Sequence, residues 1–182
     1  TCMLRYTIPG YARRRKRRHR ELLTYLSDEG WEATDEFKQL EASAPTNADE
    51  LTIETLALDL NGTLSIDGKL IEGVVECLQQ VHLADVRLLL LTGDVRGTAL
   101  EIQKRLAAES VPIELVVCKD PRGTAFAKFL QLLKLDHTRL AYMGNGQGDV
   151  LAVQLADFSV ALTQGEFASS ETIRYAVGHE TS

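Results

Sequence analysis

Apolar runs of strand length alternate with segments of helical length from residue 51 onward. The predicted strands are 53–59, 86–91, 113–117, 138–143 and 157–162, and the predicted helices are 71–83, 96–108, 122–135 and 147–156. Because the strands are apolar almost throughout, both faces of their sheet should be covered, as in parallel sheets with right-handed helical crossovers. The pattern predicts an α/β fold with a doubly wound parallel sheet of about five strands.

Residues 65–70 contain Asp67-Gly68 between apolar residues, which is the strongest short signal for a β-hairpin. We predict a small flap hairpin there, beside Asp59. The connections between the other predicted elements are short, as is usual in compact domains. No insertion is therefore long enough to build a separate cap domain.

The first 50 residues differ in composition from the rest. Arg13 to Arg20 form a basic block without interleaved aromatic residues, for which a solvated, disordered arm is expected. Binding of this block to nucleic acid or an anionic surface is the alternative. Residues 21–40 have helical composition, broken by Gly30, and residues 43–50 are predicted to be a polar linker. We therefore expect two parts: a basic arm and amphipathic helical segment over 1–50, and a domain over 51–182.

Composition narrows the class of protein. The chain has 182 residues, of which 45 % are hydrophobic and 25 % charged, as in soluble globular proteins. It shows neither a membrane-spanning run nor a signal peptide, so a cytoplasmic location is expected. Cys2, Cys77 and Cys118 are scattered, which argues against a disulfide framework or a zinc site. Eight of the twenty Lys and Arg residues lie in the first twenty positions, so residues 21–182 carry a net charge of −14. This negative charge disfavours nucleic acid as the main partner.

Polar, glycine-containing turns follow three of the predicted strands. They are Asp59-Leu-Asn-Gly-Thr, Thr92-Gly-Asp, and Gly144-Asn-Gly-Gln-Gly-Asp. Because ligands of open α/β sheets bind beyond the carboxyl ends of the strands, these turns should share one crevice. Their oxygen atoms, few in number and partly anionic, suit Mg²⁺ better than softer metals.

These turns, together with Lys128 on a predicted helix, resemble the four motifs of the haloacid-dehalogenase-like phosphohydrolases. More narrowly, they are similar to the small soluble proteins related to the phosphorylation domain of P-type ATPases. The resemblance covers roughly residues 53–168 and implies a Rossmann-like phosphohydrolase domain without an inserted cap. It implies that residues 51–182 form that domain and that Mg²⁺ is the cofactor.

The resemblance also implies a role for each matching residue. Asp59 would be the nucleophile that forms an aspartyl phosphate. The catalytic set would be Asp59, Asn61, Thr92 and Lys128; the phosphate-binding set Gly62, Thr63, Gly93 and Lys128; and the metal-binding set Asp59, the carbonyl of Asn61, Asn145 and Asp149. Lys119 is the alternative to Lys128, which is preferred because it lies 16 residues before Gly144, a spacing similar to the family's.

The chain departs from the family pattern at two positions. The family's usual phosphatases carry a general acid and base, an Asp, where Asn61 stands. Such help is worth on the order of 10²–10⁴ in rate, so alkyl phosphates should react slowly, and aryl phosphates or ATP should be affected least. P-type ATPases also lack that Asp. Asn145 replaces a carboxylate found in many relatives, which should weaken Mg²⁺ binding.

The resulting prediction is a Mg²⁺-dependent phosphohydrolase, a phosphatase or a soluble ATPase-like enzyme, acting on a small phosphorylated substrate or nucleotide. The alternative is a non-catalytic protein of the same fold that binds phosphate or metal. Without a cap domain the site is open, so a neighbouring subunit or a large substrate would have to exclude water from it. A homo-oligomer is one way to meet this requirement.

Overall fold

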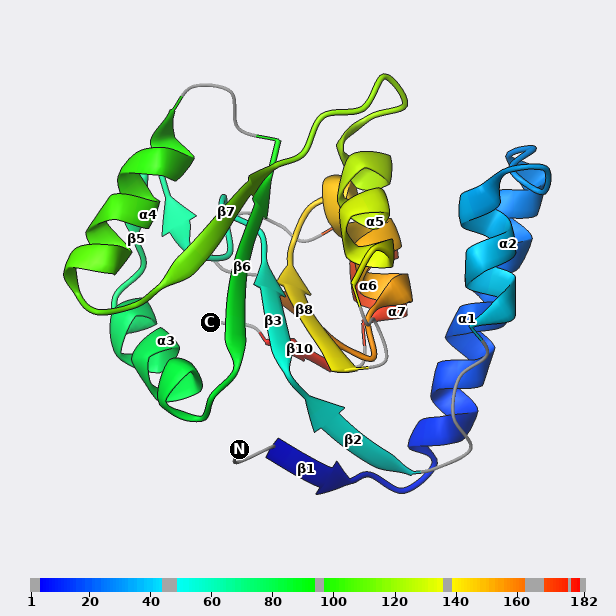
Figure 1. Ribbon diagram of the computed structural model, residues 1–182, viewed down its shortest axis with the longest axis horizontal. Helices are drawn as coiled ribbons and strands as arrows, with labels where there is room; N and C mark the ends of the chain where they lie inside the picture. The colour runs from blue at the N-terminus through cyan, green and yellow to red at the C-terminus, as the bar shows by residue number, and fades with distance from the viewer. Residues whose placement is uncertain are drawn as a thin grey trace.

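The structure, a computed structural model, describes residues 4–43, 49–93, 97–135, 139–162, 169–176 and 178–180. Its centre is a six-stranded parallel sheet with the strand order β10-β9-β8-β3-β6-β7 (Figure 1). These strands are β3 (Thr55–Leu58), β6 (Arg87–Thr92), β7 (Ile113–Val117), β8 (Leu140–Gly144), β9 (Phe158–Leu162) and β10 (Gly178–Glu180). The predicted α/β fold with a parallel, Rossmann-like sheet is confirmed.

All five predicted strands are present in this sheet, and β10 adds a short edge strand that the sequence did not indicate. The first predicted strand, 53–59, is divided at Glu54. Its main chain is bonded on both sides, to the carbonyl of Arg139 and the N–H of Arg87, so the main sheet begins there. The preceding residues form β2 (Glu50–Ile53), which pairs with β1 (Leu4–Thr7) in a separate antiparallel sheet.

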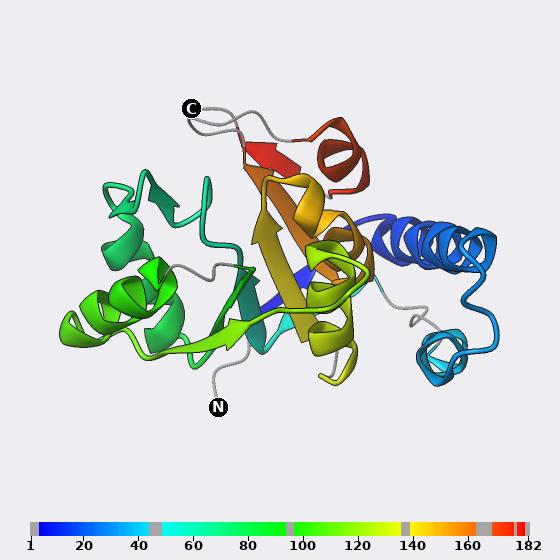
Figure 2. The same ribbon diagram turned by 90° about the horizontal axis from the view of Figure 1, so that it is seen from above.

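Helices cover the sheet on two sides (Figure 2). The described helices are α1 (Tyr11–Asp28), α2 (Asp35–Ala42), α3 (Val74–Leu83), α4 (Thr98–Ala108), α5 (Thr124–Leu133), the 3₁₀ turn η2 (Gln147–Asp149), α6 (Val150–Leu155) and α7 (Ser170–Tyr175). Side chains alternate along β3: Leu56 and Leu58 pack in the core under α3 and α4, and Ala57 packs in the core under α5 and α6. We call these two clusters the α3-side core and the α5-side core.

The predicted flap is present. Strands β4 (Ser65–Ile66) and β5 (Lys69–Leu70) pair antiparallel around Asp67 and Gly68. Both turn residues have positive φ, 51° and 74°, as the favoured two-residue hairpin turn requires. In the part of the chain that the structure describes, no cap domain is inserted beside this hairpin.

The expectation of a disordered basic arm is wrong, because residues 13–20 lie inside α1. Arg15 and Arg18 are buried, with 6 % and 4 % of their surface exposed. Arg18 donates hydrogen bonds to the carbonyls of Val153 (3.2 Å) and Asp157 (2.7 Å) and to Oγ of Ser159 (2.9 Å). Arg15 forms an ion pair with the Asp157 carboxylate. The charged block is therefore half of an amphipathic helix, and its buried members bind acceptors on α6, on β9 and on Asp157 between them.

The spacing of the buried residues explains why α1 packs. The buried residues of α1 are Tyr11, Arg15, Arg18, Leu22 and Leu26. They recur every three or four positions and so form one helix face. The prediction of a solvated arm considered only the charge of residues 13–20 and therefore missed this face. The aliphatic part of an arginine side chain packs like an apolar side chain when the guanidinium has hydrogen-bond acceptors. Burial lowers the pKa of Arg18 to about 10, so its guanidinium stays charged at neutral pH.

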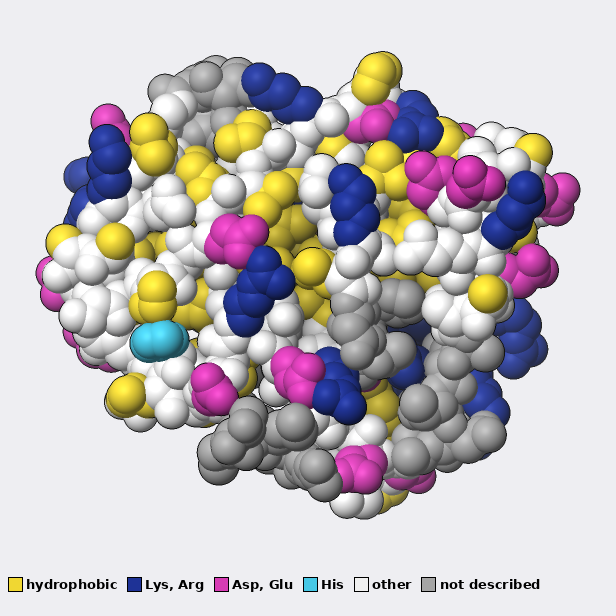
Figure 3. All heavy atoms as spheres, in the orientation of Figure 1, with side chains coloured by type: hydrophobic (Ala, Val, Ile, Leu, Met, Phe, Trp, Pro, Cys, Tyr) yellow, Lys and Arg dark blue, Asp and Glu magenta, His cyan; other side chains and the backbone are white. Residues whose placement is uncertain are grey.

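The opposite face of α1 carries Arg13, Lys16, Arg17 and Arg20, all exposed. Basic side chains gather along the edge of the molecule at which α1 lies, and elsewhere on this face charges of both signs are interspersed (Figure 3). Contact of this edge with nucleic acid remains the alternative named above. None of the described helices is long and apolar enough to cross a membrane.

The N-terminal segment shares a core with the rest of the chain. Leu22, Leu26 and Leu40 belong to the α5-side core together with Phe129 and Tyr142. The side chain of Thr34 caps α2 by accepting the N–H of Phe37 at 3.2 Å. A division of the chain near residue 50 stays a prediction, and residues 44–48 of the proposed linker lie outside the described residues.

The packing of α1 predicts unequal effects for two neighbouring arginines. Arg18→Ala should lower the free energy of unfolding by about 2–4 kcal/mol, because it leaves buried acceptors unpaired. Arg17→Ala should change the free energy of unfolding by less than about 0.5 kcal/mol, because the Arg17 side chain is 67 % exposed. Its one ion pair, from Nε to Oε1 of Glu21 at 3.8 Å, lies on the surface and is weak. Urea unfolding of both variants measures the difference; equal midpoints would contradict the packing of α1.

Candidate active site

The candidate site forms where β3 ends between its two neighbours. β3 pairs with β6 on one side and β8 on the other, in parallel register. The N–H of Asp59 donates to the carbonyl of Met143 at 2.9 Å, so the residue after β3 lies beside the end of β8. Thr92 ends β6 and Gly144 ends β8. The three predicted turns therefore meet at one edge of the sheet, as expected for their parallel strands.

Lys128 joins two of these turns. Its Nζ lies 2.5 Å from Oδ1 of Asp59 and 2.6 Å from Oδ1 of Asp149. The lysine comes from the second turn of α5 and is only 2 % exposed. Burial opposes its charge, but the two carboxylates outweigh burial and raise the pKa of Lys128, so it is an ammonium at neutral pH. The alternative, Lys119, is exposed.

Asp149 uses all of its hydrogen-bonding capacity within the protein. Oδ1 accepts Nζ of Lys128 and the hydroxyl of Tyr142, both at 2.6 Å. Oδ2 accepts the N–H groups of Asn145 (3.0 Å) and Gly146 (2.9 Å). A carboxylate has about four lone-pair positions, and all of them are occupied here. This geometry favours Asp149 as the anchor of Lys128 and of the 144–149 loop, and leaves no lone pair for the predicted metal bond.

Close approach around this loop explains two of its glycines. A Cβ on Gly144 would lie 2.5 Å from Cγ of Asp149, so a larger residue would displace the carboxylate. Gly62, at φ +74°, lies against Asn145, whose Nδ2 would be 1.9 Å from a Cβ at that position. The first and third turns are thus in direct contact, and a side chain at either glycine would separate them.

The Asp59 carboxylate is suited to act as a nucleophile. Its side chain is 14 % exposed, and the hydrogen bond from Lys128 involves Oδ1. Burial raises the pKa of Asp59 to about 6, with Lys128 opposing the rise and Asp149 adding to it. The group is therefore ionised at neutral pH, as a nucleophilic carboxylate has to be.

The remaining predicted residues lie in different surroundings. Thr92 is 2 % exposed, and its carbonyl accepts the N–H of Cys118 at 2.7 Å. Asn61 is exposed. The N–H of Gly62 already donates to the carbonyl of Ser65 at 2.7 Å, within the turn. Thr63 is buried and lines a cavity on the α3 side of the sheet, away from Lys128. Thus Gly62 and Thr63 are the predicted phosphate ligands that this geometry supports least.

Two residues at the site were missed from the sequence. Tyr142 fixes Asp149 through its hydroxyl, and it stands on the α5 face of β8 with Leu140. Strand alternation could have revealed it, since it lies two residues before Gly144. Thr124, the first residue of α5, lies beside the backbone of both Gly93 and Gly148: its Oγ1 would be 3.0 Å from a Cβ on Gly93, and its Cγ2 3.4 Å from one on Gly148. Sequence carries no signal for that contact.

The oxygen atoms at this edge fit a divalent cation that phosphate helps to hold. The carboxylate of Asp59, the carbonyl of Asn61 and the side-chain amide of Asn145 are the predicted ligands that would hold it. Among the described residues, no group of three or more His, Cys, Asp or Glu side chains could hold a metal. Mg²⁺ is commonly bound by one or two carboxylates, with waters and substrate phosphate completing its shell. The donor set therefore fits Mg²⁺, with weak binding before substrate arrives.

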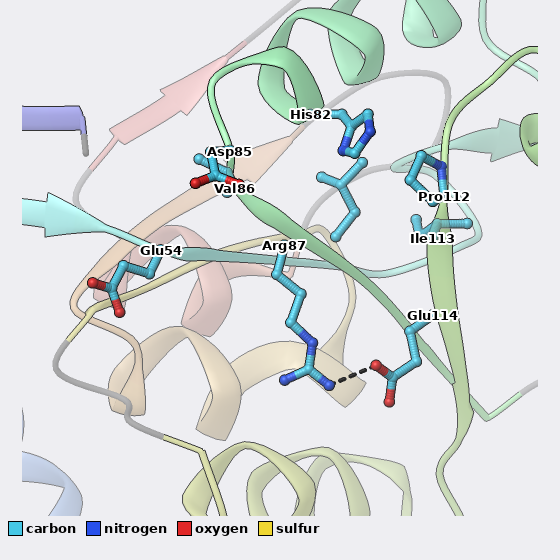
Figure 4. A pocket seen from close by; sticks show the side chains of 9 residues that line it. Glu54, His82, Asp85, Val86, Arg87, Pro112, Ile113 and Glu114 are labelled. Atoms are coloured by element: carbon cyan, nitrogen blue, oxygen red, sulfur yellow. Dashed lines mark hydrogen bonds and ion pairs between the residues drawn. The ribbon is translucent and has the colours of Figure 1, made fainter. Parts of the chain in front are cut away.

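A cavity of about 510 Å³ lies at the end of the sheet where the strands begin, opposite the candidate active site (Figure 4). It is lined by Arg87 and Glu114 at the beginnings of β6 and β7, and by His82 near the end of α3. Arg87 and Glu114 form an ion pair at 2.5 Å across it. Because sheets of this type bind ligands at the carboxyl ends of their strands, its size does not make this cavity the active site.

A sequence profile of the haloacid dehalogenase-like hydrolases matches residues 6–157. The chain belongs to this family. The predicted hydrolase of this class is therefore confirmed. The match begins at residue 6, so it includes much of the N-terminal segment that was expected to lie outside the resemblance. A narrower relation to P-type ATPases stays a prediction. Among curated proteins, no match is found.

Solved structures of low sequence identity share the fold. A 3-deoxy-D-manno-octulosonate 8-phosphate phosphatase from Moraxella catarrhalis, in complex with magnesium, phosphate and KDO, is 19 % identical with a TM-score of 0.55, over 70 % of this chain and 76 % of that one. A phospho-aspartyl intermediate analogue of phosphoserine phosphatase is 10 % identical with a TM-score of 0.57, over 70 % and 92 %. A cobalt-bound phosphatase of the first kind from Haemophilus influenzae is 16 % identical with a TM-score of 0.51, over 70 % and 77 %.

The two carboxylates beside Lys128 should differ in their effect on stability. Asp149→Asn should lower the free energy of unfolding by about 3 kcal/mol or more, because an amide cannot accept all four donors around it. Asp59→Asn should change it by less than about 1 kcal/mol at pH 7, since Lys128 keeps Asp149 and a buried charge is removed. Denaturant unfolding of the two variants measures the contrast; a larger loss for Asp59→Asn would refute it.

The raised pKa of Asp59 also fixes a pH dependence. The folded protein holds this proton more tightly than the unfolded chain, whose Asp has a pKa near 3.8. The unfolded chain is therefore the first to lose the proton, and wild-type stability should fall, relative to Asp59→Asn, as pH rises from about 4 to 6. Above about pH 6 the difference should be constant. Unfolding curves at pH 4, 5, 6 and 7 test the sign.

Proposed function

We propose that this haloacid dehalogenase-like hydrolase is a Mg²⁺-dependent phosphohydrolase that forms an aspartyl phosphate at Asp59. The observation that carries the proposal is the buried Lys128 ammonium held between Asp59 and Asp149 at the carboxyl end of β3. A carboxylate can approach an anionic phosphoryl group only if positive charge lies beside both. The fold shared with an aspartyl-phosphate analogue of phosphoserine phosphatase, and with a phosphatase complexed with magnesium and phosphate, supports the same assignment.

The first step would be attack by a carboxylate oxygen of Asp59 on phosphorus, with the leaving group departing along the opposite direction. Lys128, with the hydroxyl of Thr92 and the N–H of Gly93, would bind the phosphoryl oxygens. Bound Mg²⁺ would supply positive charge that offsets repulsion between the carboxylate and the phosphate. Water then attacks the phosphorus of the acyl phosphate, which releases phosphate and regenerates Asp59.

The leaving group defines the substrate class. Asn61, where the family's usual phosphatases have an acid, has an amide that neither gives nor takes a proton near pH 7. The leaving group must therefore depart without help, which favours aryl phosphates and the anhydride of ATP over alkyl phosphates. A nucleotide substrate would agree with the predicted similarity to the phosphorylation domain of P-type ATPases.

A second candidate function is binding without turnover. Asn61, Asn145 and the fully occupied carboxylate of Asp149 favour it, because among the predicted metal ligands they leave the carboxylate of Asp59 alone to place negative charge directly on a cation. In that case the site would hold phosphate or a cation while Asp59 stayed unmodified. The predicted homo-oligomer and cytoplasmic location are independent of this choice and stay predictions.

Hydrolysis of 4-nitrophenyl phosphate and of ATP with Mg²⁺ tests the proposal. Asp59→Asn should abolish turnover, and Lys128→Met should reduce it by roughly 10²–10³, as the loss of a charge-stabilising group does. Lys119→Met is the matched control, since this lysine is exposed, and it should change turnover by less than about twofold. Turnover that survives Asp59→Asn would overturn the proposal. Phosphate or Mg²⁺ binding, with neither turnover nor a beryllofluoride adduct, would support the second candidate.

Asn61→Asp should restore the missing acid. We expect hydrolysis of an alkyl phosphate to rise by roughly 10-fold or more, and that of 4-nitrophenyl phosphate to rise much less, because a nitrophenolate needs no proton. The ratio of the two kcat/KM values measures this effect apart from any general change in activity. An unchanged ratio would contradict the role assigned to residue 61.

A further inference from the structure

Thr124, the first residue of α5, has its side chain between two loops of the candidate active site. Its methyl carbon, Cγ2, would lie 3.1 Å from a Cβ on Gly93 and 3.4 Å from one on Gly148. Its hydroxyl oxygen, Oγ1, would lie 3.0 Å from the Cβ on Gly93. Gly93 follows β6, and Gly148 belongs to the loop after β8, and β3 lies between these two strands. Thr124 is therefore close to both loops that flank Asp59.

The helix α5 carries Thr124 and Lys128 on the same face. The two residues are four positions apart, about one helical turn, so their side chains leave the helix in similar directions. Because α5 follows the parallel strand β7, it begins at the carboxyl edge of the sheet and runs back along it (Figure 1). Thr124 thus lies nearer the open end of the site than Lys128 does. The exposures agree, since Thr124 is exposed whereas only 2 % of Lys128 is.

The predicted phosphate ligands leave room for a further donor. A transferred phosphoryl group spreads its charge over three equatorial oxygens. Lys128 already directs two of its three N–H donors at carboxylates, so one is left for phosphate. The N–H of Gly62 donates within its own turn, and Thr63 lies on the α3 side of the sheet. The hydroxyl of Thr124 makes no hydrogen bond to a described residue, so it is available on the α5 side.

We propose that the hydroxyl of Thr124 donates a hydrogen bond to a non-bridging oxygen of the transferred phosphoryl group. This inference rests on the proposed function, because it adds a phosphate-binding residue to the same site. The phosphoryl group then has hydroxyl donors from two elements, Thr92 at the end of β6 and Thr124 at the start of α5. The methyl group of Thr124 has a separate task, since it packs against both loops.

Two substitutions separate these tasks. Thr124→Val keeps the shape of the side chain and removes the hydroxyl, whereas Thr124→Ser keeps the hydroxyl and removes the methyl group. Thr124→Val should lower kcat/KM for 4-nitrophenyl phosphate with Mg²⁺ about tenfold or more, as expected for a lost hydrogen bond to a charged group. Thr124→Ser should stay within about twofold of the wild type, because the side chain is exposed. If Thr124 served only to pack the loops, the order of the two variants would be reversed, and that result would overturn the proposal.

Binding of inorganic phosphate in the presence of Mg²⁺, measured by calorimetry, separates this contact from hydrolysis. Thr124→Val should bind phosphate about tenfold more weakly than the wild type. Thr24→Val is the matched control and should bind phosphate like the wild type, because Thr24 is exposed on α1 and its hydroxyl donates to the carbonyl of Arg20 at 3.0 Å.

The outcomes distinguish the two proposals. Phosphate binding that weakens in Thr124→Val, in a wild type without turnover, would refute hydrolysis and support the contact. Turnover by the wild type with an unchanged kcat/KM in Thr124→Val would support hydrolysis and overturn the contact. A wild type that neither binds phosphate nor hydrolyses 4-nitrophenyl phosphate would overturn both.

Discussion

The candidate site depends on one buried ammonium shared by two carboxylates. Lys128 lies within 2.6 Å of both Asp59 and Asp149, and burial makes each of these charges costly without the others. The three groups come from α5, from the end of β3 and from the loop after β8. Their mutual attraction therefore holds together the segments that must meet for phosphoryl chemistry, and it fixes the side of the sheet on which that chemistry can occur.

The two carboxylates have different tasks because their surroundings differ. Asp149 is held by four donors, and this keeps its position but leaves it no capacity for a further ligand. Asp59 receives the lysine on one oxygen and has its pKa raised by burial, so it remains the reactive group. The glycines around them serve the same arrangement, since the carboxylate of Asp149 approaches the backbone more closely than a Cβ would allow.

The N-terminal helix shows how charge can mislead when it is read without geometry. Arg15 and Arg18 lie in a basic block, yet they are buried against the end of α6 and the start of β9. Leucines of the same helix enter the α5-side core, which also holds Tyr142, the donor to Asp149. The helix thus supports the layer that carries Lys128 and Asp149.

The sequence alone determined the parallel α/β sheet, the flap hairpin and the meeting of three turns, because apolar periodicity and parallel connections dictate which strand ends share an edge. Lys128 was assigned to these turns from the resemblance to the family's motifs. Periodicity could not show which face of α1 would be buried, since the acceptors for Arg18 come from residues more than 130 positions away. Only the tertiary structure decided that Asp149 is saturated and that Thr63 lines the α3-side cavity. Both depend on hydrogen-bond partners and on packing between elements distant in the chain, which local residue patterns do not encode.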